Sequence, residues 1–430
     1  MYCRRICGLI MLAFAPLSYG QSVIAGVPDT VSITLDSAEQ HFSKNNLALL
    51  AARFNIEGSQ AAIQQAQLWN NPNLSVGQNI HNQFTGRWFD FTSTGNTDVE
   101  IQQLFLLAGK RGKQVHLAEI NSAIAEQTFY NLLRDLSFEL RGDFFDLYFT
   151  EQSLAFYDEA IPQLQKTVAK TEAIYDRRSI LLSEVLRLKS LLFQLETDRL
   201  GIVQHISELE TDLHILLYDS TNADHYYKAL VNEPALDSVS LDTLSVNRII
   251  ASALEDRPDY RIAKANVESD ETNLALQKSL AIPDLTLGGA WSRAGSYIPN
   301  YYALTFSIDL PILNRNQGNI AQAEYTLESD KLSLSQARLG VEREVFLAYK
   351  EALENDKLFK TFDRKFTGEY KTLVQGMIES YEKRNISIIE FADFYDSYRT
   401  SMLQMNQLQN DRAASFEKLN HAAGFTVLNP

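Results

Sequence analysis

The sequence predicts a mainly α-helical protein that also carries membrane β-strands and is built from two copies of one unit. The stretch from Leu68 to Gly77 returns as Leu280 to Gly288, and each copy continues through two alternating segments, a turn and a long helical stretch. The helical stretches, 112–175 and 318–381, are almost free of helix-breaking residues. An internal repeat of this size defines the architecture before any single residue is interpreted.

Composition excludes several classes of protein. The chain has 430 residues, and its low counts of Gly (19) and Pro (10) argue against a large all-β protein and against long disordered linkers. The formal net charge is −15, which disfavours nucleic acid as a partner because phosphate binding needs clustered Lys and Arg. Both cysteines, Cys3 and Cys7, lie in the N-terminal leader described next, so we expect no disulfide in the mature chain.

Residues 1–20 have the pattern of a secretory signal peptide. Two arginines precede the apolar run Gly8–Leu17, and the small residues Ser18 and Gly20 precede a cleavage site. A membrane anchor is the weaker alternative, because this apolar run is too short to span a bilayer.

The repeat divides the rest of the chain into two units. We expect a first structural repeat at 21–218, a linker or equatorial insert at 219–250, a second repeat at 251–425 and a C-terminal tail at 426–430. Each repeat should hold a helix, a β-hairpin and a long helical hairpin, with the β-hairpins at about 73–107 and 284–312.

The first helix is expected at 37–68, with Asp36 as its N-cap. The two long helices would each extend roughly 90–100 Å, too far for a compact globular domain. Pro162 and Gly368 lie at equivalent depth in the two copies, which predicts a shared break or bend.

The returning helix of each repeat shows a heptad seam, which predicts coiled-coil packing. Arg199 interrupts the seam of the first copy, while Ser401, Arg412 and Ser415 interrupt that of the second. The seam residues are Val185, Leu188, Leu192, Leu195, Ile202, Ile206, Leu209, Leu213 and Leu216, then Phe391, Phe394, Tyr398, Met405, Leu408 and Leu419.

Four segments alternate apolar and polar residues with period two. A tilted membrane strand of about ten residues needs one apolar and one polar face, although a half-buried soluble sheet alternates in the same way. Aromatic residues near the strand ends favour the membrane: Trp88, Phe89, Phe91, Tyr297, Tyr301 and Tyr302. The four apolar sets are Leu74, Val76, Ile80 and Phe84; Val99, Ile101 and Phe105; Leu285, Leu287 and Trp291; and Tyr302, Leu304, Phe306, Ile308 and Leu310.

Four strands cannot close a barrel alone, and open strand edges are not tolerated in lipid. Chains must therefore share strands, giving eight strands from two chains or twelve from three. An eight-stranded barrel is largely filled by its own side chains, whereas a larger barrel leaves an open bore. A transport function therefore favours three chains, although the sequence itself does not give the number of subunits.

At this point the pattern resembles the TolC-type outer-membrane efflux proteins, over roughly Ile33 to Phe425. The resemblance rests on the duplication, on the strand entry Asn71–Leu74 and on Leu310–Ile312 closing the second hairpin. The opening of the first helix contributes Leu35, Asp36, Ala38, Asn45 and Asn46. The turn Ala108–Gly112 looks like the branch that serves heavy-metal and related pumps of the resistance-nodulation-division type.

The resemblance implies a homotrimer, with a twelve-stranded β-barrel in the outer membrane continued by an α-helical barrel across the periplasm. Its partners would be outer-membrane lipid, a periplasmic adaptor (membrane fusion) protein and an inner-membrane pump. The channel would export substrates passively, with energy supplied by the pump.

The resemblance also places a gate at the periplasmic tip, where acidic residues of the returning helix narrow the entrance. The matching positions are Glu390 and Asp393, which a three-residue step puts on one helix face. In the first copy Glu184 matches the first position, but Arg187 replaces the second acid. A mixed Glu184/Arg187 ring could pair with the acids of the second copy, and the sequence leaves open whether ion pairs or packing hold the mouth closed.

We expect no enzyme, cofactor or resident metal. The sequence shows no paired carboxylates in a cleft, no Ser/His/Asp set and no phosphate-binding loop, and His81 is interpreted as an ordinary wall residue. Five Met and seven His, without mature Cys, leave little for a soft-metal relay. The alternatives are a periplasmic coiled-coil adaptor or structural protein without a pore, and a secreted hydrolase. The exported cargo and the cognate pump stay open.

Overall fold

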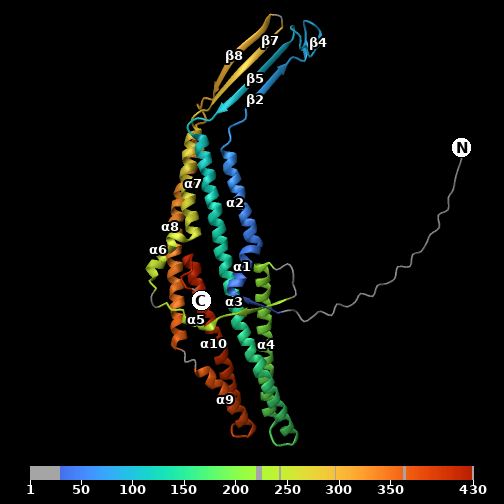
Figure 1. Cartoon of the computed structure of the whole chain (residues 1–430), viewed down its shortest axis with the longest axis vertical. Coiled ribbons are helices and arrows are strands. Elements are labelled where there is room, and N and C mark those ends of the chain that lie inside the picture. Colours follow the sequence, from blue (N-terminus) through green and yellow to red (C-terminus); the bar gives the residue numbers. More distant parts are fainter. Residues whose placement is uncertain (1–29, 219–224, 242–243, 296, 362–364, 429–430) are drawn as a thin grey trace, which may run out of the picture.

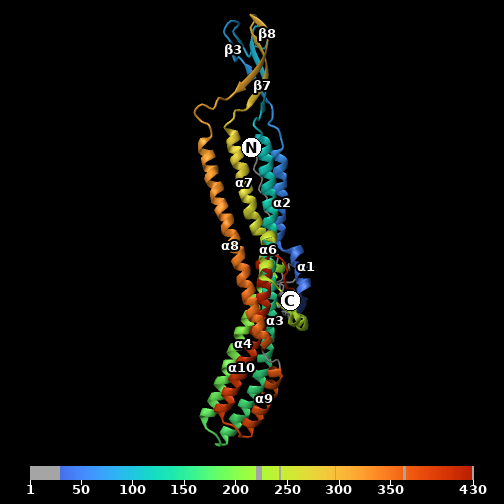
Figure 2. The same ribbon diagram turned by 90° about the vertical axis from the view of Figure 1, so that its left-hand side faces the viewer.

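The protein is a long rod with a β-sheet at one end and two helical hairpin tips at the other (Figure 1). The computed structural model describes residues 30–218, 225–241, 244–295, 297–361 and 365–428. The view turned by 90° shows the helices running between the sheet and the tips along the same axis (Figure 2). The mainly helical fold predicted from the sequence is confirmed.

The helices follow the same order in both repeats. The first repeat holds α1 (Leu35–Asn45), α2 (Leu47–Ala66), α3 (Lys110–Asp176) and α4 (Leu182–Leu217). The second holds α6 (Val246–Asp256), α7 (Pro258–Leu280), α8 (Gln317–Thr361), α9 (Lys365–Glu382) and α10 (Ile388–Ala423). Within the described ranges, none of these helices combines the length and apolarity that a membrane crossing requires.

Two expectations about the first helix are wrong. It is divided at Asn46, whose buried side chain accepts a hydrogen bond from the Leu49 N–H and so caps α2. The N-cap of α1 is Thr34, because its hydroxyl accepts from the Ser37 N–H, and Asp36 lies in the first turn.

The break predicted at Pro162 is also wrong, since α3 continues through this residue. Ile161 and Leu164 on either side of it are buried in the helical core above the tips, and this packing holds the helix across the missing hydrogen bond. Gly368 lies within α9 rather than at a break. In the second copy the described residues of α8 end at Thr361 and those of α9 begin at Lys365.

Both repeats contribute to one antiparallel sheet with the order β2-β5-β7-β8. Its strands are β2 (Asn73–Gln78), β5 (Asn96–Phe105), β7 (Leu285–Ala294) and β8 (Ile298–Ile308). The register aligns Val76, Val99, Trp291 and Tyr302 across all four strands. These apolar residues therefore share one face, and the predicted alternation is confirmed for β5, β7 and β8.

The first strand is shorter than predicted, because β2 ends at Gln78. Ile80 and Phe84 therefore do not belong to this sheet. The chain turns instead into a small hairpin of β3 (His81–Asn82) and β4 (Arg87–Trp88).

The insert between the repeats forms a small mixed layer at mid-length. It contains β6 (Tyr226–Leu230) and α5 (Glu233–Ser238). The strand β1 (Thr30–Thr34) pairs with β6 in parallel, which joins the start of the described chain to the insert. Buried residues of α1, α3, α4 and β6 form one core here, including Phe42, Phe144, Leu213 and Tyr227.

Candidate functional site

The two tips are built in the same way, which is direct structural evidence of the duplication. Arg178, after α3, and Arg384, after α9, both adopt left-handed backbone conformations, with φ of 58° and 63°. The Arg178 N–H donates to the Tyr175 carbonyl at 2.7 Å, and the Arg384 N–H donates to the Tyr381 carbonyl at 2.9 Å. The returning helix of each tip, α4 in one and α10 in the other, therefore follows an equivalent turn.

The structure brings two of the four predicted gate residues together. The Arg187 guanidinium of α4 lies 3.8 Å from the Asp393 carboxylate of α10 (Nη2 to Oδ1). Both side chains are exposed, at 48% and 72%. The pair links the returning helices of the two repeats within one chain.

Glu390 lies in the first turn of α10, the helix that also carries Asp393. Its carboxylate accepts a hydrogen bond from the Ser387 backbone N–H at 2.8 Å, and the Ser387 hydroxyl accepts from the Glu390 N–H. This capping box begins α10. The hydrogen bonds from the Ser387 backbone and side chain hold the pKa of Glu390 below its ordinary value.

Glu184 lies in the first turn of α4 and lines a groove of about 600 Å³ between the two tips. Arg177, Tyr381 and Arg384 line the same groove. An ion pair from Lys170 to Glu382 (2.6 Å) bridges α3 and α9 beside it.

Aromatic packing supports the tip from within. The rings of Tyr381 and Phe391 stack with centroids 4.9 Å apart. The Tyr395 hydroxyl donates to the Ala160 carbonyl, and burial raises the pKa of this phenol. The predicted coiled-coil seam therefore becomes a packed core that includes Leu188, Leu195 and Phe391.

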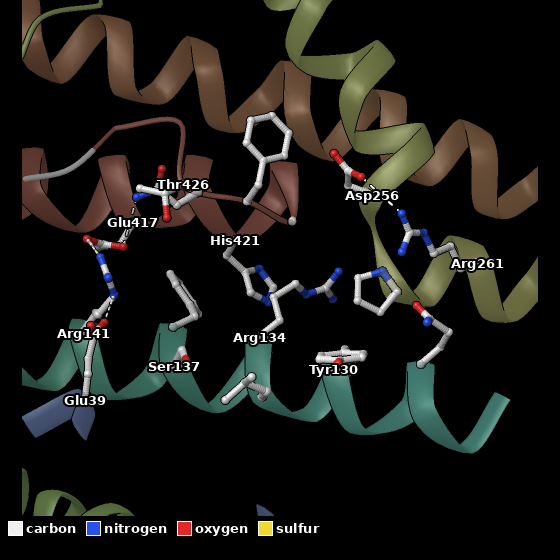
Figure 3. A pocket seen from close by; sticks show the side chains of 17 residues that line it. Glu39, Tyr130, Arg134, Ser137, Arg141, Asp256, Arg261, Glu417, His421 and Thr426 are labelled. Carbon is white, nitrogen blue, oxygen red and sulfur yellow. Dashed lines mark hydrogen bonds and ion pairs between the residues drawn. The ribbon is translucent and has the colours of Figure 1, made fainter. Parts of the chain in front are cut away.

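A pocket of about 510 Å³ lies at mid-length between α3, α10 and the start of α7. Figure 3 shows Arg134 and Arg141 reaching from α3 toward Glu417 and His421 of α10. Arg141 bonds to Glu39 (2.6 Å) and to Glu417 (3.0 Å). Burial lowers the pKa of Arg141, but these two carboxylates outweigh that effect and raise it.

The charged network around this pocket continues to α8. His421 contacts Asp135 at 2.7 Å, Arg134 contacts Asp259 at 3.3 Å, and Asp259 also binds Arg257. Arg257 reaches Glu344 of α8 at 2.7 Å. Because every charge named here has an opposite partner, we interpret the pocket as a structural junction between the repeats.

A second junction lies where the sheet meets the helices. The Lys110 ammonium, 2% exposed as a residue, contacts the Asp284 carboxylate at 2.7 Å and the Ile282 carbonyl at 2.6 Å. The Leu107 N–H also donates to Asp284. This cluster ties the start of α3 in the first repeat to the start of β7 in the second.

The polar face of the sheet carries two carboxylates, Asp98 and Glu100 of β5. The Ser292 hydroxyl donates to Asp98, and the Thr305 hydroxyl donates to Glu100 at 3.1 Å. Gly288 lies on the same face, where an added Cβ would come within 2.5 Å of the Thr305 hydroxyl. The strands therefore pack closely around these acids.

Sequence reasoning missed the buried Arg412, which appeared only as an interruption of the seam. Its guanidinium contacts Asp356 at 2.9 Å and donates to the carbonyls of Leu236 and Val239. Arg412 thereby anchors the insert to α10. The usable signal was a charged residue in an otherwise apolar seam.

Solved structures of bacterial membrane proteins have the same fold. The fold is shared by the crystal structure of a membrane protein from Pseudomonas aeruginosa, with a TM-score of 0.75, 15% identity and coverage of 90% of this chain and 92% of that chain. It is also shared by the outer membrane protein VceC from Vibrio cholerae, with a TM-score of 0.72, 16% identity and coverage of 91% and 96%.

Residues 249–425 match the family model described as "Outer membrane efflux protein". The chain is also 23% identical over 341 residues to the cobalt-zinc-cadmium resistance protein CzcC of Cupriavidus metallidurans, covering 78% of this chain and 77% of that protein. These similarities confirm the resemblance to outer-membrane efflux proteins that was drawn from the sequence.

Proposed function

We propose that this protein is the outer-membrane channel of a tripartite efflux system and passively conducts substrates from the periplasm to the outside. The observation that carries the proposal is the single sheet to which both repeats contribute. It has one apolar and one polar face, and each of its edge strands, β2 and β8, pairs on one side only within the described part of the chain. An adaptor or structural protein without a pore would not need such a sheet.

The open edges support assembly with further copies of the chain. Because lipid offers no hydrogen-bonding groups, each β2 must pair with a β8 of a neighbouring copy. A homotrimer gives a barrel of twelve strands, wide enough for a bore, and the helices continue this barrel into the periplasm.

The polar face of the sheet would then line the bore. Asp98 and Glu100 would bring six carboxylates to the wall of a trimer, which favours cations. The relative CzcC is named for resistance to cobalt, zinc and cadmium, and we propose metal cations as the cargo class. Among the described residues, no three His, Cys, Asp or Glu side chains are grouped to hold a metal ion. The cation would therefore pass as a substrate.

The periplasmic tip would be the regulated entrance. Arg187 and Asp393 close it by an ion pair, Glu390 fixes the start of α10, and Glu184 lines the groove between the tips. A periplasmic adaptor and an inner-membrane pump would engage this end, and the pump would supply the energy.

The test is purification from outer-membrane fractions, followed by recording in a planar bilayer. We expect a detergent-requiring, heat-modifiable oligomer whose open channel prefers cations. Replacing Asp98 by Asn and Glu100 by Gln should reduce this preference, while Glu126→Gln, on the exposed surface of α3, should not. A soluble monomer without channel activity would refute the proposal.

A further inference from the structure

The extracellular loop between β2 and β5, residues 79–95, carries several aromatic side chains that are exposed to solvent. Phe84 is fully exposed at 101%, Trp88 is 70% exposed and Phe91 is 68% exposed. The loop lies at the free β2 edge, on the far side of the sheet from β8 (Figure 1).

Two buried polar residues hold this loop in shape. Asp90, 3% exposed, accepts hydrogen bonds from the Asn82 side chain (2.9 Å) and from the hydroxyls of Thr85 (3.2 Å) and Thr94 (2.8 Å). Asn82, 5% exposed, donates to the Thr94 carbonyl, and its side-chain oxygen accepts from the Phe84 N–H at 3.0 Å. The backbone of Phe84 is therefore fixed although its ring touches little.

Gly95 packs directly against the backbone of Asp90 in this loop, so no side chain can be accommodated at this position. A Cβ at this position would lie 1.5 Å from the Asp90 carbonyl oxygen. The carboxylate of Asp90 has its pKa held well below the ordinary value by its hydrogen bonds to Thr92, Thr94 and Asn82, so the loop keeps its charge at any physiological pH.

The opposite edge of the sheet offers a matching surface. The strand β8 has eleven residues and β2 has six, so a neighbouring β2 can pair with at most six of the eleven. The turn before β8 and the first half of this strand also expose aromatic rings, with Tyr297 at 93% and Tyr302 at 76%. Aromatic side chains presented on a rigid support are efficient anchors, because little conformational freedom is lost when they bind.

We propose that the aromatic loop, residues 79–95, packs over the extracellular end of β8 in the neighbouring copy, with Phe84 as its anchor against Tyr297 and Tyr302. The loop thereby completes the seam where β2 is too short to do so. This inference depends on the proposed function, since it requires a ring of copies.

Cysteine cross-linking tests the contact in a background with Cys3 and Cys7 replaced by Ser. In the variant that carries both Phe84→Cys and Tyr302→Cys, we expect oxidation to link separate chains into dimers and trimers. Within one chain, three strand spacings of about 4.8 Å separate the two sheet edges, beyond the roughly 7 Å between Cα atoms that a disulfide allows. Each single substitution should give no linked product, and Phe54→Cys with Tyr302→Cys should give none either.

A second pair separates this inference from the proposed assembly. Leu74→Cys on β2 and Phe306→Cys on β8, joined by a short bismaleimide, report the barrel seam itself. Linkage of this pair without linkage of the loop pair overturns the aromatic contact and leaves the trimer intact. Failure of both pairs refutes the ring of copies.

Two alternative contacts of the loop would also be detected. Linkage by Phe84→Cys alone would mean that the loops meet one another at the axis, which overturns the proposal. Strong quenching of Trp88 fluorescence by brominated lipid chains, measured with the other two tryptophans replaced by Phe, would show that the loop enters the outer leaflet, which also overturns it. Phe84→Tyr should keep the oligomer's resistance to heating in SDS, and Phe84→Ser should lower it.

Discussion

Arg187 of α4 and Asp393 of α10 face each other at the periplasmic tip, 3.8 Å apart. These residues occupy equivalent positions in the two repeats, where one copy holds a base and the other an acid. An opposite-charge pair now joins helices that two acids would drive apart. The pair therefore links the returning helices of the two repeats.

Reversing one charge of this pair should open the tip. Because both side chains are exposed, the pair contributes no more than about 1 kcal/mol per copy, and Arg187→Glu should shift the closed-to-open equilibrium by up to about fivefold per copy. Single-channel recording should show higher resting conductance, which the double variant Arg187→Asp with Asp393→Arg should bring back toward that of the parent. Equal conductance in all three proteins would show that the Arg187–Asp393 pair does not contribute to gating.

Substitution of Glu390 should affect the start of α10 rather than a charge ring alone. Glu390→Gln keeps a hydrogen-bond acceptor for the Ser387 N–H, whereas Glu390→Ala removes it. Hydrogen exchange of the first turn of α10 should therefore be faster in the Ala variant than in the Gln variant. If both variants raise conductance equally and leave exchange unchanged, charge and not capping is what Glu390 supplies.

The hydrogen bonds between Glu390 and Ser387 also make the stability of the first turn of α10 depend on pH. The pKa of Glu390 is lower in the folded protein than in the unfolded chain. Its stabilising effect is therefore fully present above the ordinary Glu pKa and is lost only as the pH falls through the lowered folded pKa. Protection of the first turn of α10 should persist at pH 5 in the parent protein.

The sequence predicted the duplicated helices and the two-faced sheet because periodicity records which side of an element is apolar. It failed where a polar side chain performs a local task. Asn82 lies within the first predicted strand, yet its side chain organises the loop that follows β2. Asn46 divides a helix that its composition favours, because its side chain caps the following one.

The seam interruptions show the same limit of sequence reasoning. Arg199 is a surface residue that contacts Asp158, as its charge suggests. Arg412 interrupts the seam in the same way, yet it is only 1% exposed. Only the spatial position of Asp356, fifty-six residues earlier, distinguishes the two arginines. The pairing of Arg187 with Asp393 likewise depends on α4 and α10 being neighbours, which the sequence does not specify.

Removing the Arg412 side chain should strongly destabilise the middle of the rod. Arg412 lies between the rings of Phe359 and Phe416, at 4.3 Å and 4.7 Å, and its partner Asp356 is also buried. Breaking a buried ion pair from one side costs about 3–5 kcal/mol. Because Lys360 lies 2.9 Å from Asp356 and still pairs with it, we expect a loss near the lower end of this range.

Thermal unfolding of Arg412→Ala should therefore begin far below that of the parent. The matched control Arg199→Ala removes an exposed arginine and should lie within about 1 kcal/mol of the parent. Combining Arg412→Met with Asp356→Leu should recover part of the loss, since no charge is then stranded. Similar melting of the Arg412 and Arg199 single variants would contradict the structural role of Arg412.

Neutralising Asp143 of α3 should stabilise the protein at alkaline pH. Burial, together with the nearby carboxylates of Asp212, Glu139 and Asp146, raises the pKa of Asp143 from 3.8 to about 7. Its buried oxygen Oδ2 has no hydrogen-bond partner in the described part of the chain. Between these two pKa values the folded state holds a proton that the unfolded state has released, so stability falls as the pH rises from about 4 to about 7.

Asp143→Asn imitates the protonated form, so its melting temperature should exceed that of the parent at pH 8, with a smaller difference at pH 5. The control Asp146→Asn should instead lower the melting temperature relative to the parent. Asp146 accepts a hydrogen bond from the Asn410 amide at 2.8 Å and lies 3.0 Å from His205, and asparagine would keep only one acceptor oxygen for these two contacts. A melting-temperature difference for Asp143→Asn that is equal at both pH values would show that the carboxyl titrates normally in the folded protein.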